Sequence, residues 1–483
     1  MATDSSMPAT VIGKAEFSNA EDASEFATDL SRWRLNVDNG RHMWEYLESE
    51  DEARKRPQSF LERYWLGLPC ELPARPRATR AEEAVENGWE FFKRLQTADG
   101  HWGCNDDGPL FVTSGMVIAR YIVGIPIDSH IKQEMCRYLL NVVNEDGGWG
   151  LFIQSPSTVF GTVMNYCMLR ILGLGPDHPA MARARNTLLR LGSARATPTW
   201  GKFWLCVLGV YEWEGMIPLP PEPLLLPARI SDERLQQAVD LILGMENAGG
   251  GFSAYEPVRG PKFLELLNIT ELYENVMTDN LYPECTSSVI MSLTTFAGEY
   301  PTYRAQDIQA CISRSVDYLL RSQYPNGGWF ASWGVCFTYA TMFALQGLAC
   351  VGLHESNCDA CQRACDFLLQ HQNADGGWGE SLDSVRFKQY LPHPDGSQFT
   401  NTAYAVIGLL AARCANHEAV RSGVAYLMKQ QKDTGEWLPG ALEGVYAPPG
   451  GMRYPNYKFH FTLMALGRYA AIHGDECLAA QLV

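Results

Sequence analysis

Apolar residues recur at helical spacing through most of the chain. Ile312, Val316 and Leu319 lie at positions i, i+4 and i+7, and similar spacing returns over residues 403–410, directly after Thr400 and Asn401. Such spacing places apolar side chains on one face of an α-helix, and Thr or Asn just before it is a common helix cap. Strand-like alternation of apolar and polar residues is scarce. The pattern therefore predicts an all-α fold.

A short phrase recurs between the helical segments: Gln, three residues, Gly, one residue and Trp. The full copies are Gln96/Gly100/Trp102, Gln323/Gly327/Trp329, Gln372/Gly376/Trp378 and Gln431/Gly435/Trp437. Two further copies keep the spacing with substitutions, Val143/Gly147/Trp149 and Glu246/Gly250/Phe252. Internal similarity at fixed spacing is typical of a repeat architecture.

The repeated phrase has a structural interpretation. Its Gly can take the left-handed conformation that ends a helix. The Gln amide can then hydrogen-bond the start of the next helix, with the Trp stacked beside it. We therefore expect the repeat Gln and Trp residues to join helix pairs into a ring or solenoid, with no part in chemistry.

Two proline-rich stretches interrupt the helical pattern. Residues 218–227 (PLPPEPLLLP) cannot form a helix, because proline lacks the amide hydrogen that a helix needs, and residues 447–451 (APPGG) form a second loop. The chain of 483 residues is also too long for one ordinary core. We expect an N-terminal segment over 1–90, part of a first α/α domain over 91–228, and part of a C-terminal α/α barrel over 229–483.

The acidic composition disfavours some classes of binding partner for this chain. A formal net charge of −16 disfavours nucleic acid and a basic membrane-binding patch. No apolar run is long enough to span a bilayer, and residues 1–22 lack the apolar core of a secretory signal. Fourteen cysteines without such a signal indicate reduced thiols inside the cell.

Cys358, Cys361 and Cys365 are close enough in sequence to suggest a metal site. Cys361, Cys365 and Leu368 share the spacing of one helix face, and no second cysteine pair follows at zinc-finger spacing. We therefore expect these thiols to be packed in the core, and no bound metal.

Longer strings point to one enzyme family. TWGKFWLCVLGVYEWEG (199–215), SAYEPVRG (253–260) and SWGVCFTY (332–339) accompany the Gln-Gly-Trp repeats. On these strings the chain resembles the oxidosqualene cyclases, a family of triterpene synthases. The resemblance implies two α/α-toroid barrels of the α6/α6 type. It also implies monotopic attachment to the endoplasmic reticulum or lipid-droplet membrane.

The resemblance further implies an isomerase that cyclises (3S)-2,3-oxidosqualene without a metal or cofactor. Within the family, the APPGGMR stretch (447–453) favours a protostane-type sterol precursor. Opening the epoxide needs a carboxylic acid that is still protonated near neutral pH, which burial achieves by raising its pKa. The cations that follow need aromatic faces and the exclusion of water.

Individual site residues follow from the same resemblance. Cys285, in ECTSS, corresponds to the thiol that hydrogen-bonds the catalytic acid. The aromatic residues expected around the substrate are Trp200, Tyr255, Tyr273, Trp333, Tyr446 and Tyr454. Without the resemblance, each would be interpreted as an ordinary buried aromatic.

The chain departs from the family at its acid. The family motif, Asp-Cys-Thr-Ala-Glu or Asp-Thr-Thr-Ala-Glu, is absent from the sequence. The family pattern breaks across Ala228–Ile230, so we expect an internal segment to be missing there and the second domain to be incomplete.

The acids that remain are poor substitutes by their sequence context. Glu284 adjoins Cys285 and is the least poor of them, but neighbouring residues of a helix or strand point in different directions. Asp232 suits a helix cap, and Asp106 and Asp107 suit a solvated turn. Losing a general acid costs about 10²–10⁴ in rate, so the sequence predicts an inactive or weakly active chain.

Two alternatives to a working cyclase remain at this point. One is a non-catalytic lipid-binding or interaction protein that keeps the helical scaffold. The other is a protein prenyltransferase β-subunit, which also has helical barrels but needs a zinc site from Asp, Cys and His. The 10 His residues form no such constellation in the sequence, which disfavours the second alternative.

Overall fold

The computed structural model describes residues 23–38, 40–103, 110–153, 155–213, 232–254, 257–258, 260–267, 278–445, 450–474 and 476–481. Within these ranges the chain is helical apart from two small antiparallel hairpins, β1–β2 (Trp33–Asp38 and Arg41–Tyr46) and β3–β4 (Gly444–Val445 and Gly451–Met452). The all-α prediction is therefore confirmed. None of the described helices combines the length and the apolar character that crossing a bilayer requires.

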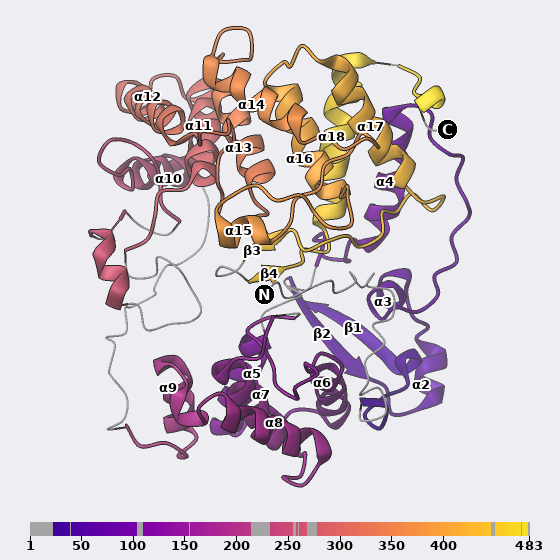
Figure 1. The fold of residues 1–483 in the computed structure, drawn as a ribbon. Helices are drawn as coiled ribbons and strands as arrows, with labels where there is room; N and C mark the ends of the chain where they lie inside the picture. The colour runs from indigo at the N-terminus through magenta and orange to yellow at the C-terminus, as the bar shows by residue number, and fades with distance from the viewer. Residues whose placement is uncertain are drawn as a thin grey trace, which may run out of the picture.

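The longer helices form two groups (Figure 1). The N-terminal group contains α5 (Leu110–Ile122), α6 (Ser129–Asn141), α7 (Val159–Leu172), α8 (Pro179–Arg190) and α9 (Thr199–Val207). The C-terminal group contains α10 (Asp232–Gly244), α11 (Pro283–Glu299), α12 (Ala305–Ser322), α13 (Phe337–Cys350), α14 (Asp359–Gln370), α16 (Phe399–Ala411), α17 (His417–Gln430) and α18 (Tyr457–His473). Helix α4 (Ala81–Phe92) and the short helices α2 (Glu50–Lys55), α3 (Phe60–Trp65) and α15 (Asp383–Phe387) complete the described α-helices.

Some predicted features fall outside the described residues. These are the proline-rich stretch 218–227, the predicted break at Ala228–Ile230 and residues 447–449 of the second loop. Where the helix of residues 403–410 begins, the cap prediction was wrong. Helix α16 starts at Phe399, and Thr400 and Asn401 are buried in its first turn. There the Asn401 amide donates to the Val335 carbonyl oxygen (3.2 Å), so a tertiary contact outweighs the cap preference.

The repeat tryptophans fasten helix ends. The indole N–H of Trp378 donates to the carbonyl oxygen of Leu368 (2.6 Å), in the last turn of α14. The same bond, to the carbonyl ten residues earlier, is made by Trp102, Trp149, Trp329 and Trp437. The last carbonyls of a helix have no partner within it, so each indole satisfies a helix end.

The repeat glutamines join neighbouring helix pairs, as predicted. The side-chain amide of Gln323 donates to the carbonyl oxygen of Ala360 (2.8 Å) at the start of α14. That of Gln372 donates to Ala419 (2.8 Å) at the start of α17. In the Gln96 copy, the described bond runs only to Gly100 within the same phrase, and a side chain added at Gly100 would meet no atom within 4 Å. That copy therefore has no described neighbour to join.

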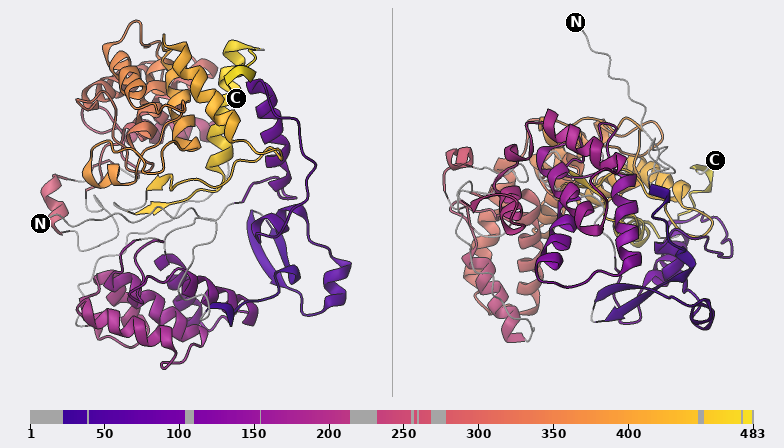
Figure 2. Two further views of the ribbon diagram at one scale, coloured as in Figure 1. Left: turned by 45° about the vertical axis from the view of Figure 1, so that its right-hand side comes forward. Right: turned by 90° about the horizontal axis from the view of Figure 1, so that it is seen from below.

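The last repeat closes onto a helix from near the start of the chain. Gln431 donates to the carbonyl oxygen of Ala84 (2.9 Å) in α4 (Ala81–Phe92), 347 residues earlier. Phe91 and Phe92 of α4 belong to the same hydrophobic core as Trp437 and Phe459. Figure 2 shows the indigo helix α4 beside the yellow helix α18. By its packing, α4 is therefore part of the C-terminal barrel.

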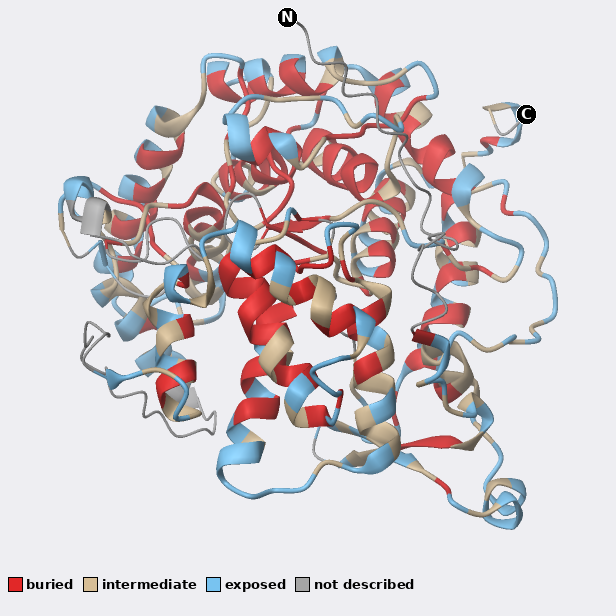
Figure 3. Cartoon of the chain, turned by 60° about the horizontal axis from the view of Figure 1, so that its bottom comes forward, coloured by how far each residue is buried: buried red, intermediate tan, exposed pale blue. Residues whose placement is uncertain are grey.

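Four helices form the inner layer of this barrel and lie side by side in the order α11, α13, α16 and α18. Helices α12, α14, α17 and α4 pack outside them, and α10 packs against α12. Within the described residues, α11 and α18, the two ends of the inner row, share no packed interface. Figure 3 shows how the buried residues, in red, gather on the inner sides of the helices.

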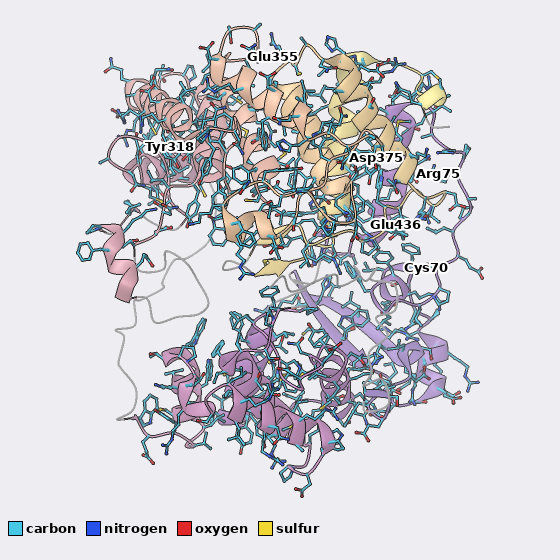
Figure 4. All side chains as sticks on the ribbon, viewed as in Figure 1. Cys70, Arg75, Tyr318, Glu355, Asp375 and Glu436 are labelled. Carbon is cyan, nitrogen blue, oxygen red and sulfur yellow. The ribbon has the colours of Figure 1, made fainter. Side chains whose placement is uncertain are left out.

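A buried ion pair ties helix α3 to the barrel. The Lys458 ammonium, on α18, lies 3.0 Å from the Glu436 carboxylate and donates to the Tyr64 hydroxyl of α3 (2.8 Å). The Lys458 side chain is only 5% exposed, and burial lowers its pKa while Glu436 opposes that shift. Figure 4 labels Glu436 where α3 meets the C-terminal helices. A buried lysine needs such partners, because an unpaired buried charge is strongly destabilising.

Candidate active site

A cavity of about 540 Å³, widely open to solvent, lies beside the start of α11. Its walls come from α10, the segment after the Phe252 repeat, α11, the Trp333 loop and α13. The lining residues are Ile242, Met245, Phe252, Ser253, Ala254, Glu284, Cys285, Ser288, Val289, Trp333, Tyr339 and Phe343. The walls are mostly apolar, which suits a hydrocarbon ligand.

Glu284 is the only carboxyl among these lining residues. It sits in the first turn of α11, whose start is held by a bond from the Tyr282 amide to the Phe252 carbonyl oxygen (2.9 Å). Its side chain is buried, with 4% exposure. Oε1 accepts the backbone N–H of Ser332 (3.1 Å), whereas Oε2 has no hydrogen-bond partner within the described residues. One oxygen is therefore anchored, and the other is buried without a hydrogen-bond partner in the described residues.

Burial controls the protonation of this site. It raises the pKa of the Glu284 carboxyl to about 7, although the amides of Ser332 and Trp333 oppose the shift. The first turn of a helix also favours an anion, so desolvation outweighs two opposing effects. Burial, helped by the nearby Glu284 carboxyl, raises the pKa of the Cys285 thiol to about 12. Near neutral pH, a large share of Glu284 is therefore protonated, and Cys285 stays a neutral thiol.

Aromatic rings surround the carboxyl and continue away from it. Trp333 lines the cavity, with its ring centre 6.1 Å from that of Tyr282. Tyr339 also lines it, 5.0 Å from Phe343 and 5.3 Å from the buried Tyr404. Aromatic faces stabilise cations without acting as nucleophiles, by about 0.5–2 kcal/mol each.

Two other predicted site residues are described but do not line the cavity. Trp200, on α9 in the N-terminal group, lies against Phe111 and Phe160, with ring centres 5.9 and 6.4 Å away. Tyr454 stacks on Tyr457 at 4.6 Å, and its hydroxyl lies 3.1 Å from the Met452 sulfur. The structure therefore brings Cys285 and Trp333 together and leaves Trp200 in the other helical group.

The remaining candidates lie outside the described residues. These are Tyr255, Tyr273 and Tyr446 of the predicted cavity, and Asp106 and Asp107 among the substitute acids. Asp232 begins α10, and nothing of its side chain is described.

Sequence reasoning missed Tyr339 and left the orientation of Glu284 open. Tyr339 lies inside the SWGVCFTY string, so the signal for it was present but unused. Glu284 is the least poor substitute acid by sequence, but its position beside Cys285 does not decide whether both residues face one cavity. Both residues nevertheless line the cavity, because it wraps around the first turn of α11 and meets successive faces of the helix.

Two other buried carboxyls do not compete with Glu284. The Glu380 carboxylate accepts backbone N–H groups of Cys336, Phe337 and Thr338, so it caps the start of α13. Burial raises the pKa of Glu443 to about 7, but Glu443 is not among the residues lining the cavity. Glu284 is therefore the buried acid placed to meet a ligand there.

A larger hollow of about 1000 Å³ lies in the N-terminal group, against α7, α8 and α9. Glu212 is the carboxyl among its lining residues, and it is exposed. The Glu284 carboxyl, by contrast, is buried. The smaller cavity at α11 is therefore the better candidate for acid chemistry.

Comparison with known proteins identifies relatives over the whole chain. The profile of the squalene-hopene cyclase N-terminal domain matches residues 85–233, and that of the C-terminal domain matches residues 227–471. The chain is 61% identical to protostadienol synthase A of Neosartorya fischeri, with 100% of both covered. It is 29% identical to lanosterol synthase of Homo sapiens, with 94% of this chain and 98% of that protein covered. Among solved structures, ent-copalyl diphosphate synthase from Streptomyces platensis has a TM-score of 0.44 at 15% identity, covering 82% of this chain and 100% of that one.

The first of these alignments also bears on the missing acid. It runs over 738 positions, whereas this chain has 483 residues. Because the alignment reaches both ends of both proteins, roughly a third of its positions are internal and lack a residue of this chain. The prediction that an internal segment is missing is thereby confirmed.

Proposed function

Because this chain belongs to the squalene-hopene and oxidosqualene cyclase family, we propose that it cyclises (3S)-2,3-oxidosqualene to a protostane-type sterol precursor. The relative at 61% identity is named for a protostane product, which supports this product class over the lanosterol type. The oxidosqualene substrate follows from the family.

The observation that carries the proposal is Glu284. Its carboxyl is buried in an apolar cavity, with a pKa of about 7 and one oxygen free of partners in the described residues. In the proposed reaction, the Glu284 proton passes to the epoxide oxygen as a carbon–oxygen bond breaks. The nearest alkene π bond then attacks the resulting cation, and successive alkenes extend the rings. Loss of a proton to solvent or a base ends the sequence and leaves the alcohol.

The cavity residues have separate parts in this scheme. Trp333 and Tyr339 present ring faces to the cation, and the neutral Cys285 thiol lies beside the acid without trapping the cation. The open side of the cavity works against the reaction, because water that enters can capture an early cation. We therefore expect slow turnover, with incompletely cyclised alcohols beside the protostane product.

The experiment is product formation in a yeast strain without its own lanosterol synthase. Cells expressing the 483-residue chain are expected to accumulate a cyclised triterpene alcohol, identified by mass spectrometry and NMR. The control is the same strain with an empty vector, which should accumulate oxidosqualene. Oxidosqualene alone, in cells where the chain is present as folded protein, would contradict the proposal.

We also propose that the protein binds one leaflet of a membrane, at the endoplasmic reticulum or lipid droplets. Support comes from Tyr121, Ile122, Val123 and Ile125, which are exposed at the end of α5. Clustered exposed apolar side chains are typical of membrane or protein contacts. Flotation with neutral phosphatidylcholine vesicles should recover the chain, and Val123→Asp should lower the bound fraction. Leu438→Asp, an equally polar change at an exposed site in the other helical group, should not.

A further inference from the structure

A second cluster of reactive side chains lies on the rim of the C-terminal barrel. It joins Glu355, in the loop after α13, with Cys365 on α14 and Cys414 in the loop after α16. One ligand atom from each residue lies within 4.8 Å of the other two. None of the three lines the cavity at Glu284. Figure 4 labels Glu355 at the top of the molecule, near α14.

The backbone holds the two loops of this cluster together. Arg413 adopts a left-handed conformation (φ 54°), which turns the chain after α16 and lets the Cys414 amide donate to Leu409 (3.0 Å). The Glu355 amide donates to the carbonyl oxygen of Ala412 (2.9 Å). Both loops are therefore anchored by hydrogen bonds that do not involve the cluster's side chains.

The carboxylate of Glu355 is oriented before any ligand binds. Its Oε2 accepts the backbone N–H of Ala415 (2.6 Å), and its Oε1 lies 3.6 Å from the Cys414 sulfur. Metal-binding carboxylates are commonly fixed by such a second hydrogen bond. Cys365 and Cys414 are almost fully buried, at 0% and 3% exposure, whereas Glu355 is half-buried. Glu355 is therefore the member of the cluster that solvent reaches.

We propose that Glu355, Cys365 and Cys414 bind a zinc ion, with water as the fourth ligand. Two sulfur atoms and a carboxylate oxygen are ligand types that zinc accepts in a tetrahedral site. Sulfur ligands of tetrahedral zinc lie about 3.8 Å apart, so the three ligand atoms would need to move together by about 1 Å or less. The carboxylate favours zinc over copper(I), which prefers sulfur ligands alone.

The bound ion would link three parts of the barrel rim. It would add to the packing and hydrogen bonds that already join the loop after α13, helix α14 and the loop after α16. This points to a structural site. The inference does not depend on the proposed cyclase activity, since no cavity residue takes part in it.

Spacing in the sequence could not have revealed this set. Of the three cysteines considered from the sequence, only Cys365 belongs to it. The thiols of Cys358 and Cys361 hydrogen-bond each other, as those of Cys365 and Cys414 do within the cluster. Cys414 and Glu355 come from other loops and approach Cys365 only when α13, α14 and α16 are packed together.

The test is metal binding by the full chain, purified with a chelator under reducing conditions. Titration with cobalt(II) is expected to produce a near-ultraviolet thiolate-to-cobalt charge-transfer band that saturates at one ion per chain. Zinc should displace the cobalt and remove the band. Cys414→Ser should weaken zinc binding by about 100-fold or more, and Glu355→Gln by about 10-fold or more.

The matched control is Cys477→Ser, which removes an exposed thiol outside the cluster and should leave the titration unchanged. The absence of a charge-transfer band in the unmodified chain would overturn the proposal. Cys477→Ser weakening zinc binding as much as Cys414→Ser would also overturn it. So would a Cys365–Cys414 disulfide, detected by mass spectrometry, that persists in protein purified under reducing conditions. The cobalt titration of the unmodified chain tests the proposal even if a cluster variant fails to fold.

Discussion

Replacing Glu284 with Gln is expected to lower the yield of cyclised triterpene by about 10²–10⁴-fold, the range for loss of a general acid. Gln keeps the shape of the side chain and can still accept the Ser332 N–H through its carbonyl oxygen. It has no acidic proton to give to the epoxide. The measurement is product formed per amount of folded protein, in the yeast strain and in a detergent extract supplied with oxidosqualene.

The pH dependence of the unmodified chain gives an independent check. The active form is the protonated acid, and the pKa of Glu284 is about 7. The rate should therefore be nearly constant well below pH 7 and fall about tenfold per pH unit above it. A rate that rises with pH through this range would show that Glu284 acts as a base or not at all.

The control for the substitution is Glu299→Gln, at the exposed end of the same helix. It removes one carboxyl from α11 without touching the cavity, and the product yield should not change. Full activity in Glu284→Gln, alongside an active unmodified chain, would reject Glu284 as the proton donor but leave the cyclase assignment standing. No product from the unmodified chain would instead count against the proposed function itself.

The second large effect is expected at Gly88, where α4 closes the barrel. A Cβ atom at this position would lie 2.6 Å from the Trp437 ring and 2.9 Å from Leu463. Trp437 is fully buried, so the ring cannot move aside without disturbing the core. Gly88→Ala should therefore destabilise the docking of α4 by about 1–3 kcal/mol, although alanine favours the helix itself.

Hydrogen–deuterium exchange of residues 81–92 measures this local stability. A loss of one or two kcal/mol corresponds to exchange that is faster by about 5–30-fold, when α4 opens locally. The matched control is Gly467→Ala on α18, where an added Cβ meets nothing within 4 Å. Gly467→Ala should leave the exchange of residues 81–92 unchanged or slightly slower, because alanine stabilises helix α18, against which α4 packs. Equal behaviour of the two variants would mean that α4 is not packed against Trp437.

The repeat architecture was predictable because its signals are local. Each phrase places a helix end, an amide donor and an indole within seven residues, so the Gln bonds to Ala360 and Ala419 follow from spacing and helix geometry. The bond from Gln431 to Ala84 uses the same chemistry. Its partner could not be named from the sequence, because closure depends on how many helix pairs the ring contains.

The candidate site was only partly predictable. Cys285 and Trp333 were named by resemblance, and they line the same cavity. The protonation of Glu284 could not be inferred, since it depends on burial by residues from α10, α13 and the Trp333 loop. Trp200, also named by resemblance, lies in the N-terminal helical group and does not line this cavity.

The closure of the barrel by α4 also has a consequence for biosynthesis. Ala84 of α4 pairs with Gln431, which is 347 residues later in the chain. Helix α4 therefore leaves the ribosome long before the C-terminal residues that bury it. At about 5–20 residues per second, the interval is roughly 20–70 s. During that time Phe91 and Phe92, later buried in the barrel core, have no native partners from α18. The nascent chain therefore carries an exposed apolar helix that a chaperone can hold until translation ends.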